Sequence, residues 1–563
     1  MKNKFYNEIK NIVGSKNVLE KKKDKAAFVT GWRAYDADCE IVITPTKLLQ
    51  MWEVLNVLNK YNKIILIQAS NTSLTGGSTP FGEYDRELVI INTLKLNKIF
   101  LINNAQQIIA FPGSTLYKLE RYLKPFNRAP HSEIGSSCIG ASIIGGICNS
   151  SGGALIKRGP AYTELSVFAK INRDGQLTLV NNLGIDLGNT PKEILNNLEN
   201  KNFPNNWANP KNKKASSTEY KETVKNVEAN TPARYNSNKS KLYESSGCSG
   251  KIAVFAARID TFKKEESETT LYLSTNKPED FTNFKKSVLS NLENLPIYAE
   301  YMHKDAYEAA KKYGKDAFLL IYFLGTSTMP IFYKIKTRIE RYFKSSKIFN
   351  SKSLDYILNI LASALPSHLP KIFDSLNKKF VHHLIFKCDT KDLKEITKIT
   401  DLIFNKEYNN IRVCDAEETK KIILNRFVFA GATARLAILD KNSNSEILAL
   451  DVAHRRNQDD WDEVLPKTIA DKIHKSLHVG HFFCNVFHRE YAVKKGSNNN
   501  AVKQMLLDRL DKMGAKFPAE HNVGHLYKAE PNHKEFFKNL DPTNSFNPGI
   551  GQMSKKSFYG KKK

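Results

Sequence analysis

Two loops of small residues, ASNTSLTGGSTP at 69–80 and GSSCIGASIIGGICNSSGG at 135–153, carry the clearest signal in this chain. Each begins near the end of a predicted strand. Small residues let backbone N–H groups come close to a pyrophosphate, and five hydroxyls add further donors: Ser70, Thr72, Ser73, Ser78 and Ser142. One such loop alone is more simply explained by tight turns and close packing. Two of them, separated by βαβ-like elements, favour a bound dinucleotide.

Both common nucleotide fingerprints are missing from the sequence. No G-x-G-x-x-G follows a strand, and no G-x-x-x-x-G-K-[ST] occurs anywhere. A Rossmann NAD site and a P-loop are therefore unsupported.

The elements around the two loops indicate an α+β protein. A helix beginning near Thr46 carries Leu48, Leu49, Trp52 and Leu55 on one face, and Asn62 ends it. The further expected elements are strands at 63–68, 88–92, 107–111, 165–180 and 251–258, and a helix at 114–126. Residues 262–300 and 380–510 show mixed helix and strand signals. Residues 200–240, rich in Lys, Asn, Ser and Pro, predict a long exposed loop.

Length and charge limit the possibilities further. A chain of 563 residues is too long for one core, so we expect two to four domains. Its net charge of +27 attracts anions such as nucleic acid, anionic lipid or an acidic substrate. A general compositional bias towards Lys and Asn explains the total charge equally well.

Cysteine usage and hydropathy bear on location. The seven cysteines form no C-x-x-C, which suits a reducing compartment. The N-terminus shows no signal peptide. The longest apolar run is 318–324, far below the roughly 20 residues of a membrane-spanning helix, so any membrane contact is expected to be peripheral.

A basic stretch, 334–379, interleaves charge with aromatic and aliphatic residues. It holds ten Lys or Arg and three acidic residues. Cations near anionic headgroups and apolar side chains at the interface together suffice for reversible adhesion. The alternative is a solvated helical face above an ordinary core.

Five of the thirteen histidines fall in a short C-terminal span: His478, His481, His488, His521 and His525. Imidazole titrates near neutral pH, so the span is a candidate for proton transfer, and Glu520 lies beside His521. Cations that could hold an anionic substrate are Arg435, Arg455 and Arg456, although most arginines only pair at the surface.

Six segments resemble the bacterial quinone-dependent D-lactate dehydrogenases, which are peripheral membrane flavoenzymes that bind FAD in the vanillyl-alcohol-oxidase manner. The resemblance runs from about residue 5 to 555 in QASNTSLTGGSTP, HSEIGSSCIGASIIGGICNSSGG, RGPAYTELSVFAKI, ESSGCSGKIAVF, PAEHNVGHLYK and DPTNSFNPGIG. It implies three parts: an FAD-binding domain with two subdomains at 1–261 and 512–563, a discontinuous mixed α/β cap (substrate) domain at 262–303 and 380–511, and a helical basic membrane-binding segment at 304–379.

By this resemblance, FAD is held without a covalent bond by Ala69, Ser70, Asn71, Thr72, Ser73, Gly77, Ser78, Gly135, Ser142, Gly152 and Val254. Ser73 departs from the pattern, because glycine is expected there. A serine at this position is expected to need a permissive backbone angle.

The histidine cluster is similar to that of related flavin-dependent 2-hydroxy acid dehydrogenases. The similarity implies that His481, His488 and Glu520 bind a divalent metal and that His521 is the base. Asn522 stands where that wider group has glycine. Without a metal, the same residues would bind lactate directly by hydrogen bonds.

The resemblance implies oxidation of D-lactate to pyruvate by hydride transfer to FAD, with electrons passed to a membrane quinone. It places the protein at the cytoplasmic face of the inner membrane, on anionic lipid. The alternatives are another D-2-hydroxy acid or a soluble electron acceptor. A nucleic-acid-binding protein would explain the charge, but no binding motif for nucleic acid appears.

Overall fold

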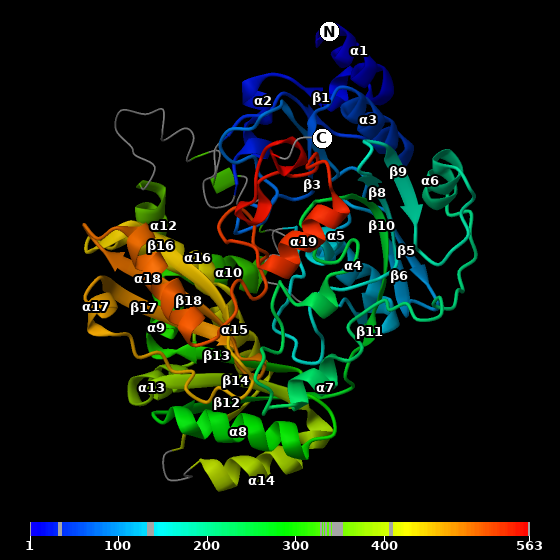
Figure 1. The fold of residues 1–563 in the computed structure, drawn as a ribbon. Helices are drawn as coiled ribbons and strands as arrows, with labels where there is room; N and C mark the ends of the chain where they lie inside the picture. The colour runs from blue at the N-terminus through cyan, green and yellow to red at the C-terminus, as the bar shows by residue number, and fades with distance from the viewer. Residues whose placement is uncertain are drawn as a thin grey trace.

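The computed structural model describes residues 2–31, 37–131, 140–326, 329, 332, 335–336, 339, 353–404 and 409–560. Gly135 and most of the stretch from 327 to 352 lie outside this description, so the predictions made for them are not addressed. The described chain forms two halves, seen together in Figure 1.

The N-terminal unit is a small mixed sheet with helices packed on it. Its strand order is β1-β2-β4-β3, with β2 and β3 both parallel to β4. The elements are α1 (Lys2–Val13), β1 (Val18–Leu19), α2 (Lys22–Val29), β2 (Val42–Ile43), α3 (Leu48–Lys60), β3 (Ile64–Gln68) and β4 (Leu88–Asn92). The first small-residue loop follows β3 directly.

The second unit is an antiparallel sheet of order β5-β6-β10-β8-β9. Its elements are β5 (Ile99–Ile102), β6 (Gln107–Ala110), α4 (Leu116–Leu123), β7 (Arg128–Ala129), α5 (Ile143–Cys148), β8 (Ser166–Ile171), β9 (Leu177–Asn181), α6 (Pro191–Glu199), α7 (Tyr220–Lys225), β10 (Ala253–Asp260) and β11 (Phe262–Lys263). One apolar core joins it to the first unit, because α3, β4, β8 and β10 all contribute to the same cluster.

The other half is built on a seven-stranded antiparallel sheet of order β15-β12-β14-β13-β17-β18-β16. Its strands are β12 (Glu268–Thr275), β13 (Tyr298–His303), β14 (His382–Asp389), β15 (Ile411–Cys414), β16 (Ser443–Ala453), β17 (Ile473–His481) and β18 (Val486–Lys494). Its helices are α8 (Pro278–Asn291), α9 (Lys304–Tyr313), α10 (Lys315–Leu324), α12 (Ser353–Ser363), α13 (Lys371–Lys379), α14 (Leu393–Ile403), α15 (Ala416–Phe427), α16 (Phe429–Leu439), α17 (Lys467–Ala470) and α18 (Asn499–Lys512).

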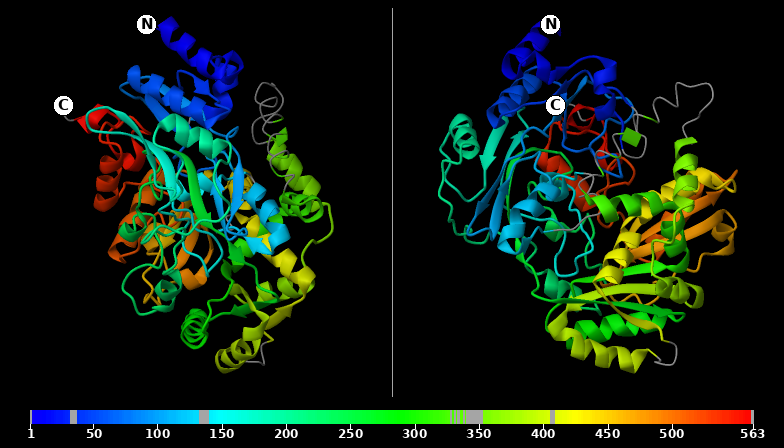
Figure 2. Two further views of the ribbon diagram at one scale, coloured as in Figure 1. Left: turned by 90° about the vertical axis from the view of Figure 1, so that its right-hand side faces the viewer. Right: turned by 180° about the vertical axis from the view of Figure 1, so that it is seen from behind.

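After this sheet the chain returns to the first half, where α19 (Pro531–Leu540) and the C-terminal residues lie beside β10 and β3 (Figure 2). The backbone N–H of Ile65 donates to Ser545, and that of Asn547 donates to Ile65. The C-terminal segment thus packs next to the small-residue loop that follows β3.

Helices from the range 304–379 pack on the seven-stranded sheet. Tyr307 of α9 and Phe373 of α13 are fully buried in the same core as Leu477 of β17. Among the described residues no single helix is long and apolar enough to cross a membrane. The pair α15 and α16, bent by 50° relative to each other, meets the length and composition requirement only together.

Most elements expected from the sequence are present within a few residues of their predicted bounds. The prediction for 200–240 is wrong in part: residues 201–214 are exposed or half-buried, but Tyr220, Val224, Arg234 and Asn236 are buried. Polar composition misled here, since Arg234 and Asn236 satisfy buried partners instead of facing water.

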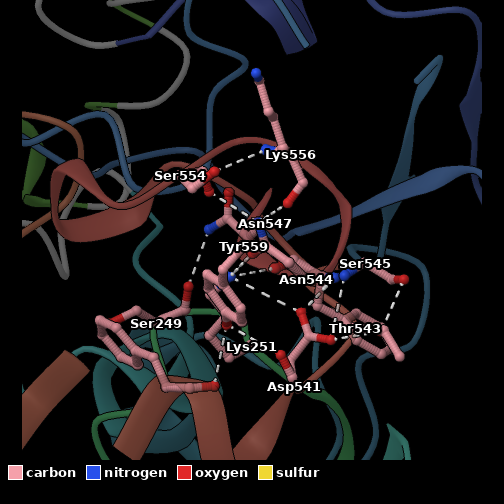
Figure 3. A network of polar contacts seen from close by, with 12 residues as sticks. Ser249, Lys251, Asp541, Thr543, Asn544, Ser545, Asn547, Ser554, Lys556 and Tyr559 are labelled. Atoms are coloured by element: carbon pink, nitrogen blue, oxygen red, sulfur yellow. Dashed lines mark hydrogen bonds and ion pairs between the residues drawn. The ribbon is translucent and has the colours of Figure 1, made fainter. Parts of the chain in front are cut away.

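A buried polar network fastens the C-terminal segment to β10 (Figure 3). The Lys251 ammonium, fully buried, donates to Asn544 Oδ1 (2.7 Å) and to the Phe546 carbonyl (3.0 Å), and lies 3.8 Å from Asp541 Oδ2. Burial lowers the pKa of Lys251 to about 8, and burial raises the pKa of Asp541. Asn547 donates both to Ser249 (2.9 Å) and to Gly77 (2.8 Å), so the network reaches the first loop.

Replacement of Asp541 by alanine is expected to destabilise the protein strongly. Asp541 also accepts the N–H groups of Ser545 and Phe546, and removing it leaves Lys251 as a buried charge without its counterion. Such losses cost about 3–5 kcal/mol. Urea denaturation of the flavin-loaded protein measures the effect. The exposed Glu446→Ala on β16 serves as the control, and equal midpoints for the two variants would contradict the assignment.

Candidate functional site

A cavity of about 1070 Å³ lies between the two halves. It is lined by both small-residue loops, by the start of β10, and by β13, β16, β17, β18, α10, α15, α16 and the loop after α18. Ten of the eleven residues predicted to hold the dinucleotide line it: Ala69, Ser70, Asn71, Thr72, Ser73, Gly77, Ser78, Ser142, Gly152 and Val254. The eleventh, Gly135, lies outside the described residues.

The first loop is shaped by hydrogen bonds that two of its own side chains accept. Asn71 holds the left-handed conformation (φ 53°), and its Oδ1 accepts hydrogen bonds from Ser78 Oγ (2.9 Å) and Thr79 Oγ1 (3.0 Å). Ser73 Oγ accepts the N–H of Gly77 at 3.1 Å. The expectation that Ser73 needs a permissive angle is wrong, because the positive φ falls on Asn71.

The second loop leads into the short helix α5. Ser142 Oγ accepts the Gly145 N–H at 3.0 Å and so caps this helix. Gly152 allows the closest approach in the site, since a Cβ there would lie 2.4 Å from the Glu520 carboxyl carbon. The second loop therefore packs directly against the Glu520-His521 segment.

The first loop is bound to the same motif by its backbone. Thr75 Oγ1 donates to the His521 carbonyl (3.1 Å), and the His525 N–H donates to the Thr75 carbonyl (2.9 Å). Gly524 (φ +50°) has no room for a side chain, because its Cβ would lie 2.2 Å from that carbonyl. These contacts fix the position of His521 relative to the loop at 69–78.

Three histidines and three carboxylates form a connected cluster in the cavity wall. His481 Nε2 lies 3.2 Å from His488 Nε2 and 3.3 Å from Glu520 Oε2. On their other sides, His481 Nδ1 contacts Glu300, and His488 Nδ1 lies 3.3 Å from Asp451. The second carboxylate oxygen of Asp451 is 3.1 Å from His521 Nδ1.

Burial and pairing compete in setting the charge states here. Burial lowers the pKa of His481, but Glu300 and Glu520 outweigh it and raise that pKa to about 9. Burial would raise the pKa of Glu520, yet Arg234 and His481 bring it down to about 2. Asp451, despite burial, has a pKa well below its usual range because His521 and His488 face it. The carboxylates are therefore ionised at neutral pH.

The donor set fits a divalent cation. Glu300 and Asp451 favour protons on the two facing Nδ1 atoms, so the Nε2 lone pairs of His481 and His488 and an oxygen of Glu520 converge. One atom from each lies within 4.8 Å of the others. Such convergence requires a positive charge at its centre, either a proton or a metal ion, and His₂Glu is a common set for the latter.

The two arginines predicted to hold a substrate carboxylate are engaged elsewhere. Arg435 makes a bidentate pair with Asp316 (2.6 and 2.8 Å) and donates to Asp355 (3.2 Å). Arg455 is not among the described residues that line the cavity, and its guanidinium packs on Gly514. A substrate anion would have to displace two carboxylates from Arg435, so both predictions are corrected.

Arg426, near the end of α15, also lines the cavity. Its Nη2 lies 2.8 Å from Glu300 Oε2, and its Nε is buried without a hydrogen bond to any described residue. Sequence reasoning missed Arg426, Asp451 and Glu300. A signal existed for the two carboxylates, because each is a lone acid in an apolar strand, in ILALDVA and YAEYMH. Arg426 has no such signal.

The cavity also fits a flavin dinucleotide. Its wall over 69–78 and 142–154 consists of small residues and backbone, as close approach to a pyrophosphate requires. At about 1070 Å³ it exceeds the roughly 300–1,000 Å³ typical of a site for one small ligand.

Comparison with known proteins agrees with this geometry. Residues 39–177 match a family model described as an FAD binding domain, and residues 270–559 match one described as D-lactate dehydrogenase, membrane binding. The chain is 46% identical over 553 residues to the quinone-dependent D-lactate dehydrogenase of Escherichia coli (strain K12), covering 98% of this chain and 97% of that one. It is 44% identical over 550 residues to that of Haemophilus influenzae, covering 97% and 98%.

Among solved structures, p-cresol methylhydroxylase with bound substrate aligns over 98% of this chain and 96% of its own, with a TM-score of 0.57 and 13% identity. At that identity the likeness speaks for the fold alone. Together with the FAD-binding match it confirms the predicted α+β class with an FAD-binding domain of the vanillyl-alcohol-oxidase type.

Proposed function

The chain belongs to the quinone-dependent D-lactate dehydrogenases, and from that premise we propose which of its residues carry out the reaction. The protein oxidises D-lactate to pyruvate, with FAD as cofactor and a membrane quinone as electron acceptor. One observation carries the assignment of residues: His521 and the loop at 69–78 line a single cavity and are hydrogen-bonded to each other.

Oxidation of lactate removes a proton from the hydroxyl group and a hydride from Cα. FAD, when bound, supplies the acceptor for the hydride. The protein must therefore provide a base, a cationic partner for the substrate carboxylate, and a pocket shielded from water.

His521 is the proposed base. Its side chain is about one-third exposed on the cavity, while Nδ1 faces Asp451 at 3.1 Å. This carboxylate favours the tautomer with a proton on Nδ1, so Nε2 is left to accept the hydroxyl proton, and it stabilises the imidazolium that results. Asp451 also accepts the N–H groups of Glu520 and His521 (2.6 and 3.1 Å), which fixes the base in position.

Arg426 is the proposed partner of the lactate carboxylate. It is the described arginine that lines the cavity with a buried Nε making no hydrogen bond to any described residue. Arg234 lies behind the cluster, where it pairs with Glu520 and donates to the Gly153 carbonyl (2.7 Å). It neutralises Glu520 rather than binding substrate.

Replacement of His521 by alanine should keep FAD bound but slow flavin reduction by D-lactate at least about 10²-fold, the contribution of a general base. Anaerobic stopped-flow bleaching of the flavin measures it. His525→Ala is the matched control from the same loop, because His525 bonds backbone carbonyls and does not line the cavity among the described residues. A near-wild-type rate for His521→Ala would refute the role.

We also propose that His481, His488 and Glu520 bind a divalent metal, with Glu300 and Asp451 orienting the two imidazoles. The alternative is that the same atoms bind lactate directly and share a proton. Three donor atoms, one from each residue, lie within 4.8 Å of one another, and each residue also pairs with an opposite charge on its other side. Both features support the metal.

Elemental analysis of purified protein decides between these two possibilities. About one equivalent of metal is expected in the wild type, and His488→Ala should lose it by tenfold or more. His478 lies three residues before His481 on β17 and belongs to neither group of candidate ligands, so His478→Ala should retain the metal. Wild-type protein that is free of metal yet fully active after exhaustive chelation would exclude the metal.

The protein associates peripherally with the membrane, and we propose that it does so on anionic lipid at the cytoplasmic face. Apolar side chains are strongly exposed at the ends of α10 and α12: Phe323 (73%), Ile360 (64%) and Leu361 (63%). We call these three the apolar patch. Exposed Lys371, Lys378 and Lys379 follow on α13. The described cysteines are all free, which suits a reducing compartment.

Vesicle sedimentation tests this proposal. Binding should require anionic lipid and weaken as salt is raised, because each cation near the surface contributes on the order of 1 kcal/mol through screened attraction. The double change Ile360→Ser and Leu361→Ser should weaken it further. Leu402→Ser, which removes an equally exposed apolar side chain from α14 at the opposite end of the cap (Figure 1), should have no effect. Equal binding to neutral vesicles would contradict the charge component.

A further inference from the structure

We propose that the apolar end of the cavity, between α10 and α16, is the binding site for the ring of the membrane quinone. This inference rests on the proposed function, because it assigns a place to the electron acceptor of that reaction.

One wall of this end is the inner face of the bent pair α15 and α16. Ile423, Phe427, Gly431, Ala434 and Ile438 all line the cavity at helical spacing. A Cβ added to Gly431 would meet no atom within 4 Å, so this wall faces open space. These five residues carry no charge.

The opposite wall comes from α10 and the residues just after it. Ile321, Met329 and Phe332 line the cavity there. Phe323 and Leu324, two and three residues beyond Ile321 on the same helix, are 73% and 59% exposed. Leu324 lies on the same face of α10 as Ile321, three residues away, so the apolar lining of the cavity continues along α10 to the surface, next to Phe323 of the apolar patch. A ligand with a long apolar tail can occupy such a path, with its tail in lipid and its ring inside.

Charge in this region is balanced. Arg435 and Lys336 are matched by Asp316 and Asp355, with Lys336 Nζ 2.9 Å from Asp355 Oδ1. All four line the cavity. Among the described residues at this end, these two cations and two anions sum to zero, so they do not favour an anionic ligand. This end suits a neutral ligand that carries hydrogen-bond acceptors.

A quinone has this chemistry: a flat neutral ring, two carbonyl oxygens and an isoprenoid tail. Arg435 and Lys336 line this end of the cavity and supply N–H donors for the quinone carbonyl oxygens. The buried ion pairs of Arg435, which excluded it as a lactate ligand, thereby form the polar rim of a second subsite.

The electron balance closes with the two partners of the established activity. The reduced flavin loses two electrons and two protons and returns to FAD. The quinone gains two electrons and two protons, and its two carbonyls become hydroxyls. No further oxidant or reductant is needed, and one cavity is lined by both the small-residue loops and this apolar end.

Gly431→Leu fills this end without harming the helix, since leucine favours helix more than glycine does. The KM for decyl-ubiquinone should rise at least about tenfold because the space is taken. Anaerobic flavin bleaching by D-lactate, and turnover with a soluble indophenol dye, should change less than about twofold. Thr397→Leu, on the exposed face of α14, is the matched control and should alter none of these.

A second measurement does not depend on turnover. An azido-quinone irradiated with the flavin-loaded wild type should label peptides from 321–336 and 423–438, and excess decyl-ubiquinone should prevent this. Gly431→Leu should not be labelled. An unchanged KM for quinone, labelling elsewhere, or equal loss of dye turnover would overturn the inference. Failure of D-lactate to bleach the wild-type flavin would instead count against the proposed function.

Discussion

Three buried carboxylates organise this protein. Glu300, Asp451 and Glu520 are each no more than 5% exposed, and an ionised carboxylate removed from water must be matched by a cation. Glu300 comes from the central strand β13 of the cap sheet, Asp451 from its edge strand β16, and Glu520 from the segment that returns to the FAD-binding half. Their partners are His481, His488, His521, Arg234 and Arg426. Satisfying these charges draws the two halves together at the site of the chemistry.

The same requirement ties the base to the flavin loop. His521 is held through its imidazole by Asp451 and through its carbonyl by Thr75, and Gly524 and Gly152 allow the two loops to close on it. The C-terminal network around Lys251 then locks the far side of the loop through Asn547 and Gly77. Positioning of the cofactor and positioning of the base are therefore one structural problem, solved by a segment 450 residues further along the chain.

The cavity changes character along its length. It begins as backbone and small residues, passes through a dense set of charges at the histidines, and ends in aliphatic and aromatic side chains beside the apolar patch. This order matches the route of the electrons from a charged substrate to a lipid-soluble acceptor. A protein that links the two needs an interior that is polar at one end and apolar at the other, and the bent pair α15 and α16 supplies the second end.

The sequence alone determined what depends on local pattern. Strand and helix periodicity located most elements, and the paired loops identified the cofactor class, whereas the assignment of His521 as the base stays a proposal. It could not choose among arginines. Arg435 sits in a conspicuous small-residue run, yet its charge is consumed by Asp316 and Asp355, whereas Arg426 carries no local signature. Nor could it detect that Tyr220, Val224, Arg234 and Asn236 are buried within the polar stretch 200–240. Charge pairing is decided by side chains from distant segments, so which polar residue is free for a ligand is settled only when the tertiary fold brings those segments together.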